Sequence, residues 1–494
     1  MSNPDRIPVI VAIGQINDRP DDPAEALDSL GLMAAALRLA DDDGGGGWLT
    51  DLDALSTVDQ ISCPELTDIA AALAARLGAT PRIVETTEMP HGDSPIRLLN
   101  LAANRIGRGE IRSMAVVGAE VLRSVAKRAA ASGTRPGDLL RANPKRRVHP
   151  YRRAFGLLAP TDMYPLYENA SRHAWGQSLA EGQAETGAIW AQMAAVAAAN
   201  PNAWLRNGAS ATDIVTPSAS NRPIAHPYTK LMVANASVNQ GAGFIVASLA
   251  EARRRGLPED RLIHIGHGAG ANEPYELLER ADFTGSVSMQ TVLTRTLSAN
   301  RISAAELAHI ELYSCFPIVP KLARRSLDWP LERPVTVFGG LTFGGAPVAN
   351  YMSHAVASMV ELLRGTSDSG LLYANGGIVT TNHAIVLSGA PLAARFPQED
   401  QAQALADAAR GPVPALAEDH VGPVTVESWT VFYDRDAQPS RGIVVARTAE
   451  GSRTLAEVPA SDTSLIAALT DGSIDPVGQS GRIAIDNGRR RFAF

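Results

Sequence analysis

The sequence predicts a layered α/β protein made of two similar halves, because one pattern of turn, helix and strand occurs twice. In the first copy, a turn at 91–95 leads into apolar residues at 96–109, and a buried strand is expected at 114–118. In the second copy, small residues at 344–347 open a stretch with apolar residues at helical spacing, and a strand with a glycine turn follows at 370–377. The alternative is a coincidence between two ordinary βα units. The duplicated fold explains both copies at once.

The first of these helices is expected to be central. Ser94 and Pro95 form a helix start, because serine can cap free N–H groups and proline suits the first helical position. The residues that follow are apolar on nearly every side, which predicts a buried helix. A turn of small residues thus lies at the positive end of a central helix, where an anion or a developing oxyanion is stabilised.

Strands and helices alternate before that turn. We expect strands at 6–14, 55–58 and 82–86, with helices at 23–39 and 66–77 between them. Such alternation is typical of a layered α/β domain.

The region 123–223 differs from this pattern. It has few strand signals and two helical runs, at 164–179 and 185–199, and we expect a helical insertion that covers one end of the sheet. Its basic loop at 141–153 is either a solvated surface loop or a clamp for a phosphorylated ligand, because Arg and Lys pair with phosphate oxygens.

The chain ends in a different class of structure. The second α/β half is expected at 262–387, and a stretch rich in Ala, Pro and acids at 395–419 is typical of a linker. From residue 424 onward apolar and polar residues alternate between turn signals, which predicts a small separate β domain, in the form of a short barrel. The expected domains are 1–122 with 224–257 as the N-terminal half, 123–223 as a helical loop domain, 258–393 as the C-terminal half, 394–420 as a linker and 421–494 as the β domain.

Composition excludes several classes of protein. The 494 residues carry a net charge of −7, which argues against general nucleic-acid binding. The two cysteines rule out a disulfide scaffold or a cysteine-rich metal protein, and no set of metal ligands is seen. No apolar run reaches the ~18 residues of a membrane span, and the apolar segment at 9–13 is too short for a signal-peptide core. We therefore expect a cytoplasmic protein.

Three segments resemble motifs of the thiolase superfamily, specifically the sterol-carrier-protein type. Ala-Asn-Ala-Ser-Val-Asn-Gln-Gly-Ala at 234–242 is the best match, followed by Tyr-Ser-Cys-Phe at 313–316 and Gly-Gly-Leu-Thr-Phe-Gly-Gly-Ala-Pro at 339–347. The resemblance covers roughly residues 7–390. It implies two similar halves in five layers (αβαβα), a loop domain that binds coenzyme A, and CoA or acyl-CoA as a ligand with no tightly bound cofactor. A homodimer is possible in this family, and a monomer is not excluded.

The chain departs from the thiolase pattern at all four catalytic positions. The acyl-accepting cysteine falls on Gly92, or on His91 if the register slips by one residue. The histidine of Gly-His-Pro is Ala346, the oxyanion Asn or His is Tyr313, and the cysteine of Cys-x-Gly-Gly is Ala374. Ordinary thiolysis through an acyl-cysteine is therefore not expected.

Three residues are candidates for the remaining chemistry. The phenol of Tyr313 can donate a hydrogen bond to an oxyanion or move a proton, or it fills the space left by the catalytic residue. His91 is a base or a turn residue. His383 faces the same pocket as a proton carrier, or makes a structural hydrogen bond.

Five residues are candidates for ligand binding. The resemblance places Ser237, next to Asn235, where thiolases touch the pantetheine, although a turn serine that satisfies its own backbone is the alternative. Lys145, Arg146 and Arg147 of the basic loop are expected to meet the nucleotide phosphates.

The resemblance implies an acyl-CoA-acting enzyme of lipid metabolism, an acyltransferase by family, with a non-standard active site. One alternative is a thiolase-like aldolase that cleaves a carbon–carbon bond in an acyl-CoA. Some of those carry tyrosine at the position of Tyr313, beside a separate small β-barrel partner. The other alternative is a non-catalytic CoA-ester-binding protein or a partner subunit.

Overall fold

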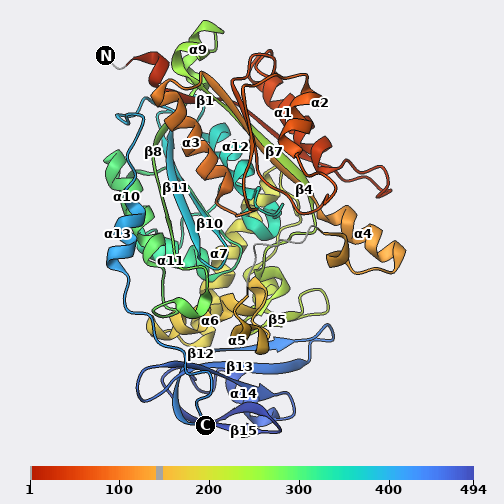
Figure 1. Ribbon diagram of the computed structural model, residues 1–494, viewed down its shortest axis with the longest axis vertical. Helices are drawn as coiled ribbons and strands as arrows, with labels where there is room; N and C mark the ends of the chain where they lie inside the picture. The colour runs from red at the N-terminus through yellow and green to blue at the C-terminus, as the bar shows by residue number, and fades with distance from the viewer. Residues whose placement is uncertain (1–2, 141–147) are drawn as a thin grey trace.

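The computed structural model describes residues 3–140 and 148–494, and its body is built on a nine-stranded sheet (Figure 1). Five strands form the N-terminal half in the order β3-β2-β4-β7-β1, and four form the C-terminal half in the order β8-β11-β10-β9. The first set is β1 (Pro8–Asn17), β2 (Ala54–Thr57), β3 (Ile83–Thr86), β4 (Ser113–Val121) and β7 (Asn239–Ser248). The second set is β8 (Ile263–Asn272), β9 (His309–Leu312), β10 (Ser369–Gly376) and β11 (Thr381–Ser388).

The two halves repeat the same strand directions. In the first half β1 is antiparallel to β7, β7 is antiparallel to β4, and β4 is parallel to β2. In the second half β8 is antiparallel to β11, β11 is antiparallel to β10, and β10 is parallel to β9. The halves meet where Val9 and Ile10 of β1 pair with His264 and Ile263 of β8. The predicted duplication is confirmed.

Helices complete five layers (Figure 1). Helices α3 and α12 lie between the two halves of the sheet, α1 and α2 cover the outer face of the first half, and α10 and α11 cover that of the second. Their bounds are α1 (Ser29–Asp43), α2 (Ile69–Leu77), α3 (Ser94–Arg108), α10 (Val287–Asn300), α11 (Ile318–Ser326) and α12 (Tyr351–Leu363). A short helix, α9 (Leu249–Arg254), follows β7. The predicted five-layered architecture is therefore confirmed.

The helix starts differ from the prediction. Ser94 does not cap α3: it is the first helical residue, Asp93 occupies the cap position without a side-chain cap, and the buried Ser94 hydroxyl has no partner in the described chain. Helix α1 begins at Ser29 rather than near residue 23, because the Asp28 carboxylate accepts the Gly31 N–H at 2.6 Å and caps it there.

The second central helix also starts later than expected, at Tyr351, after a turn of π-helix at Gly340–Gly344. The Asn350 side chain holds this start by donating to the carbonyls of Gly118 (2.6 Å) and Ala242 (3.2 Å). His354 on this helix is fully buried, because the helix has protein on every side.

The described part of the region 123–223 is mostly helical. It contains α4 (Leu122–Ser132), α5 (Pro150–Ala154), α6 (Pro160–Ala174), α7 (Leu179–Ala199) and α8 (Ala211–Val215). A capping box between Ser178 and Glu181 sets the start of α7, earlier than the predicted residue 185. A hairpin of β5 (Pro223–Ala225) and β6 (Tyr228–Thr229) follows.

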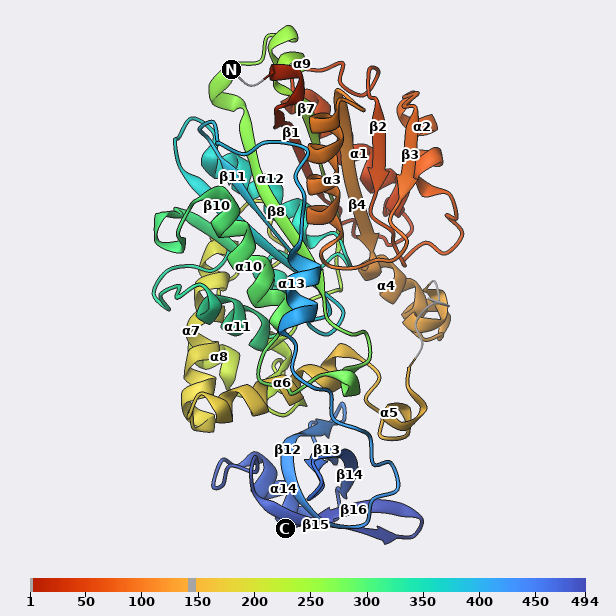
Figure 2. The same ribbon diagram turned by 60° about the vertical axis from the view of Figure 1, so that its left-hand side comes forward.

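The C-terminal region is a closed five-stranded barrel at one end of the molecule (Figure 2). Its elements are β12 (Gly422–Tyr433), β13 (Pro439–Arg447), β14 (Arg453–Pro459), α14 (Thr463–Thr470), β15 (Ser480–Asp486) and β16 (Arg489–Ala493). The pairing of β12 with both β13 and β15 closes it, which confirms the predicted barrel. The expected linker contains a helix, α13 (Ala402–Ala409), which packs against α10.

The barrel is continuous with the body. Ile443, Val445 and Leu455 pack into the core of the body, whereas the barrel interior is formed by other residues of the same strands. Strand β5 also joins the barrel sheet, where Ala225 pairs with Phe432 of β12. None of the helices in the described residues is long and apolar enough to cross a membrane.

Candidate functional site

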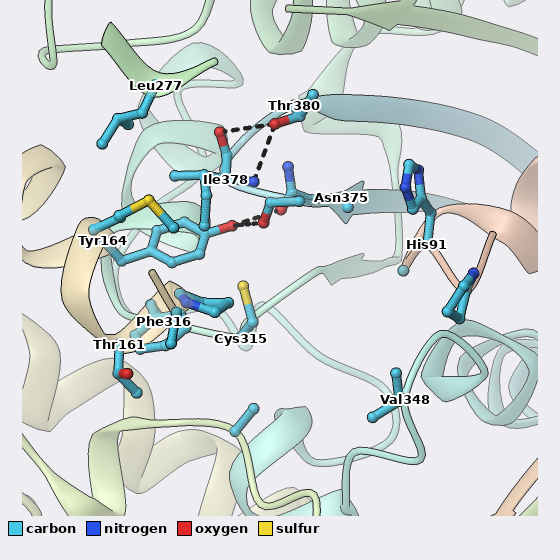
Figure 3. A pocket seen from close by; sticks show the side chains of 18 of the residues that line it. His91, Thr161, Tyr164, Leu277, Cys315, Phe316, Val348, Asn375, Ile378 and Thr380 are labelled. Carbon is cyan, nitrogen blue, oxygen red and sulfur yellow. Dashed lines mark hydrogen bonds between the residues drawn. The ribbon is translucent and has the colours of Figure 1, made fainter. Parts of the chain in front are cut away.

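A cavity of about 1590 Å³ lies where α3 begins and the glycine turn after β10 ends. Its volume exceeds the ~300–1,000 Å³ of ordinary small-molecule sites, so it has room for a long ligand. Figure 3 shows His91, Asn375 and Tyr164 along one side of this pocket, with Cys315 and Phe316 near Tyr164. The predicted residues Tyr313 and His91 both line it.

Tyr313 follows β9, and its backbone N–H donates to the Tyr373 carbonyl at 3.0 Å. Its ring packs edge-on against Tyr351, with 5.9 Å between the ring centroids. The side chain is almost buried, and among the described residues its hydroxyl has no hydrogen-bond partner. Burial raises the pKa of Tyr313 well above the ordinary value, so the phenol keeps its proton and is free to donate to a ligand.

Gly92 lies directly against this hydroxyl. A Cβ placed on Gly92 would lie 2.4 Å from the Tyr313 Oη and 2.2 Å from the carbonyl oxygen of Asn375. Both distances are shorter than any van der Waals contact, so no side chain fits at the position where the motif expects the nucleophile. The phenol of Tyr313 occupies the space that a cysteine side chain would need.

His91 is half-buried at the edge of the same cavity and lies 5.9 Å from the Tyr275 ring, centroid to centroid. Burial lowers the pKa of His91, and the charge of Asp93 partly opposes that shift. The imidazole is therefore neutral at pH 7 and is able to accept a proton.

Sequence reasoning missed Asp93. This carboxylate is almost buried in the turn before α3 and accepts a 2.6 Å hydrogen bond from the Thr381 hydroxyl. Its spacing of two residues from His91 was a usable signal, because a carboxylate beside a histidine favours the protonated imidazole.

Tyr164 and Asn375 were also missed. The Tyr164 hydroxyl donates to Asn375 Oδ1 (3.0 Å) or to the Gly377 carbonyl (2.9 Å), and it accepts the Val379 N–H (3.2 Å). The Tyr164 ring stacks on Phe316 with 4.4 Å between centroids. These contacts fix the glycine turn of the second half, which the sequence did single out, although nothing in the sequence pairs it with α6.

Cys315 lines the cavity, but burial raises the pKa of its thiol to about 12. The thiolate is the nucleophilic form of cysteine, so Cys315 is inert at neutral pH.

His383 is not among the residues that line the cavity. Thr381 of β11 lies beside the start of α3, and His383 lies two residues further along the strand, which is about 7 Å deeper. There its Nε2 lies 3.5 Å from the Asn100 amide nitrogen of α3. His383 thus lies beside Asn100 and not on the lining of the cavity, and the choice between a proton carrier and a structural hydrogen bond stays a prediction.

Ser237 and Asn235 do not line the cavity themselves, although their neighbours Ala234 and Ala236 do. Ser237 is exposed, and its N–H donates to the Asn235 side chain at 3.2 Å. The backbone of Asn235 bonds to Leu341 (3.0 Å) and Ala346 (2.9 Å), which joins two of the matched motifs.

The basic residues Lys145, Arg146 and Arg147 fall outside the described residues. Just beyond them, His149 and the exposed Arg153 line the cavity. Within 3–140 and 148–494, no group of three His, Cys, Asp or Glu is arranged to hold a metal ion.

Comparisons with known proteins agree with this geometry. Residues 405–488 match a family described as the thiolase-like protein type 1 additional C-terminal domain. A monomeric SCP2-thiolase-like protein type 1 from Mycobacterium smegmatis is 29% identical, with a TM-score of 0.85 and 100% of both chains covered. No curated protein sequence matches significantly.

Two more distant structures share the fold. The Ltp2-ChsH2(DUF35) aldolase is 18% identical with a TM-score of 0.60, over 77% of this chain and 97% of that chain. Human mitochondrial 3-ketoacyl-CoA thiolase in complex with CoA is 15% identical with a TM-score of 0.57, over 78% of this chain and 99% of that chain. The chain therefore has the fold of the thiolases, and it resembles a thiolase-like protein type 1 over its full length, including the additional C-terminal domain.

Proposed function

We propose that this chain binds an acyl-CoA in the 1590 Å³ cavity and acts on the acyl group without an acyl-cysteine intermediate. The observation that carries the proposal is the protonated, unpartnered Tyr313 hydroxyl in the space of the missing nucleophile. The CoA-bound human thiolase of the same fold supports the choice of ligand. His149 and Arg153 at the cavity edge are suited to its phosphates.

The reaction class that these groups fit best is cleavage of a 3-hydroxyacyl-CoA between its α and β carbons. Neutral His91 takes the proton of the β-hydroxyl, a carbonyl forms there, and the Cα–Cβ bond breaks. The electron pair moves onto the thioester oxygen, to which Tyr313 donates a hydrogen bond. The α-carbon then takes the proton back from His91, so the products are an aldehyde or ketone and a shortened acyl-CoA. The aldolase among the structural relatives makes this class reasonable.

A thioester-binding protein without turnover is the second candidate. Ala346 and Ala374 stand where thiolases carry a histidine and a cysteine, so two of the usual catalytic groups have no replacement at their own positions. Binding with no product from any 3-hydroxyacyl-CoA would favour this candidate.

The proposal is tested with a series of 3-hydroxyacyl-CoA esters, by thermal shift for binding and by mass spectrometry for the shortened acyl-CoA. Tyr313→Phe removes one oxyanion donor, and we expect turnover to fall about 10²–10³-fold with the dissociation constant unchanged. Tyr433→Phe in the barrel, away from the cavity, is the matched control and should retain full activity. Equal turnover in Tyr313→Phe and the unmodified protein would reject the role of the phenol.

We also propose a monomer in a reducing compartment such as the cytoplasm. The Mycobacterium smegmatis relative is described as monomeric, and both cysteines of this chain are free thiols. Sedimentation analysis tests the oligomeric state.

A further inference from the structure

Three segments of the cavity wall are not part of the central sheet or its layered helices. Two belong to the helical region 123–223, and one is a long loop of the C-terminal half. They are helix α5, the first turn of α6, and the loop at 275–281 that follows β8. We call them the outer wall. All three are hydrogen-bonded to strands of the C-terminal barrel, directly or through the next turn of the same helix.

The strongest of these links is the buried Arg453 at the start of β14. Its Nη1 donates to the carbonyls of Leu278 and Arg280, each at 2.7 Å, and its Nη2 lies 2.6 Å from the Glu427 carboxylate. The guanidinium is fully buried, and its donors have a fixed fork geometry. One barrel side chain therefore fixes two carbonyls of the 275–281 loop, whose neighbours Leu277 and Glu279 line the cavity.

Two positions further along β14, Leu455 contacts helix α5. The Tyr151 hydroxyl accepts the Leu455 N–H of β14 at 2.8 Å. The adjacent Arg152 lies 2.8 Å from the Glu276 carboxylate, so α5 and the 275–281 loop are also joined to each other. Helix α5 and the 275–281 loop thus both rest on one short stretch of β14.

Helix α6 rests on β12 in the same way. The Ser428 hydroxyl donates to the Leu166 carbonyl at 2.6 Å, and the Asn169 amide donates to the Trp429 carbonyl at 2.9 Å. The preceding turn of α6 supplies Tyr164 to the cavity.

We propose that the C-terminal barrel is the fixed support of the outer wall, with Arg453 and Tyr151 as positioning residues that set the shape of the cavity mouth. The effect on the wall follows from these contacts alone. The effect on ligand affinity rests on the acyl-CoA function proposed above.

The test uses the full chain with Arg453→Lys, which keeps the charge beside Glu427 but loses the fork. Amide hydrogen exchange is measured at Leu278 and Glu279, whose N–H groups are both hydrogen-bonded within the loop. We expect at least tenfold faster exchange there, with exchange in β10 and in the barrel strands unchanged. Tyr151→Phe should speed exchange in α5 while keeping the fold, which covers the case in which the arginine variant is unstable.

Val444→Ala is the matched control, because Val444 packs only into the barrel interior. It should weaken the barrel without faster exchange at Leu278. Unchanged exchange of the loop in Arg453→Lys, or an equal increase in Val444→Ala, would overturn the inference. Decanoyl-CoA is the affinity probe, and its dissociation constant should rise about fivefold in Arg453→Lys. If the unmodified protein does not bind decanoyl-CoA but the loop still responds, the acyl-CoA proposal fails and the wall inference stands.

Discussion

Restoring the missing nucleophile by Gly92→Cys should fail, and the geometry gives the size of the failure. The new Cβ would lie 2.2 Å from a backbone carbonyl and 2.4 Å from a buried phenol, and real Cβ contacts are essentially never below 3.0 Å. Forcing extra atoms into a packed site costs ~1–3 kcal/mol. Because one of the two partners is backbone and cannot rotate away, we expect about 3 kcal/mol of lost stability.

The assay is urea unfolding at pH 7, with the midpoint compared at constant m-value. Gly285→Ala is the control, because a Cβ at Gly285 has no atom within 4 Å. Adding Tyr313→Ala to Gly92→Cys should recover only part of the loss, because the Asn375 carbonyl remains. A Gly92→Cys protein of unchanged stability, or one that gains the mass of an acetyl group from acetyl-CoA, would refute the reasoning.

Two further predictions concern buried charge. Burial raises the pKa of Glu311 to about 7, so between about pH 4.5 and 7 the folded state holds a proton that the unfolded state has lost, and this group's contribution to stability falls as pH rises. Glu311→Gln removes this pH dependence. In urea titrations, the free energy of unfolding of the variant minus that of the unmodified protein should therefore rise by ~1.4 kcal/mol per pH unit across this window. Parallel curves of the free energy of unfolding against pH for the two proteins would contradict the raised pKa. Lys321 is fully buried and lies 2.6 Å from Glu168, so Lys321→Met should lose ~3–5 kcal/mol in the same assay by leaving a buried carboxylate unpaired, and adding Glu168→Leu should restore much of it. No recovery in the double variant would show that the loss comes from packing.

The duplicated fold was predictable because the spacing of apolar residues along short stretches of the chain indicates its helices and strands. Apolar spacing at 96–109 and at 351–363 identified both central helices, and the alternation after residue 424 identified the barrel strands. The positions at which the helices begin were harder to predict from the sequence. The start at Ser29 depends on Asp28 accepting the Gly31 N–H, and the start at Tyr351 depends on Asn350 donating to carbonyls of β4 and β7, which are distant in the sequence.

Candidate site residues could be predicted only where they align with a known motif. Tyr313 and His91 became candidates because they align with motif positions, His91 if the register slips by one residue, and both line one cavity. Asp93 and Tyr164 were missed because their partners, Thr381 and Asn375, lie more than 200 residues away in the chain. For His383 the sequence left two roles open, because its distance from the cavity depends on the helix that packs beside β11.

The junction between barrel and body has a consequence for biosynthesis. Chains emerge from the ribosome N-terminus first, and their early domains fold while later ones are still being made. Here α5, α6 and the β5–β6 hairpin are synthesised long before β12 and β14, the strands on which they rest. The core of the two halves can therefore fold on a nascent chain before the cavity mouth has its support. Until then, the apolar surface that Ile443 and Leu455 later cover stays exposed. Ribosomal pausing shortly before residue 453 would prolong that vulnerable interval, and it is the point at which chaperone binding to this chain should be strongest.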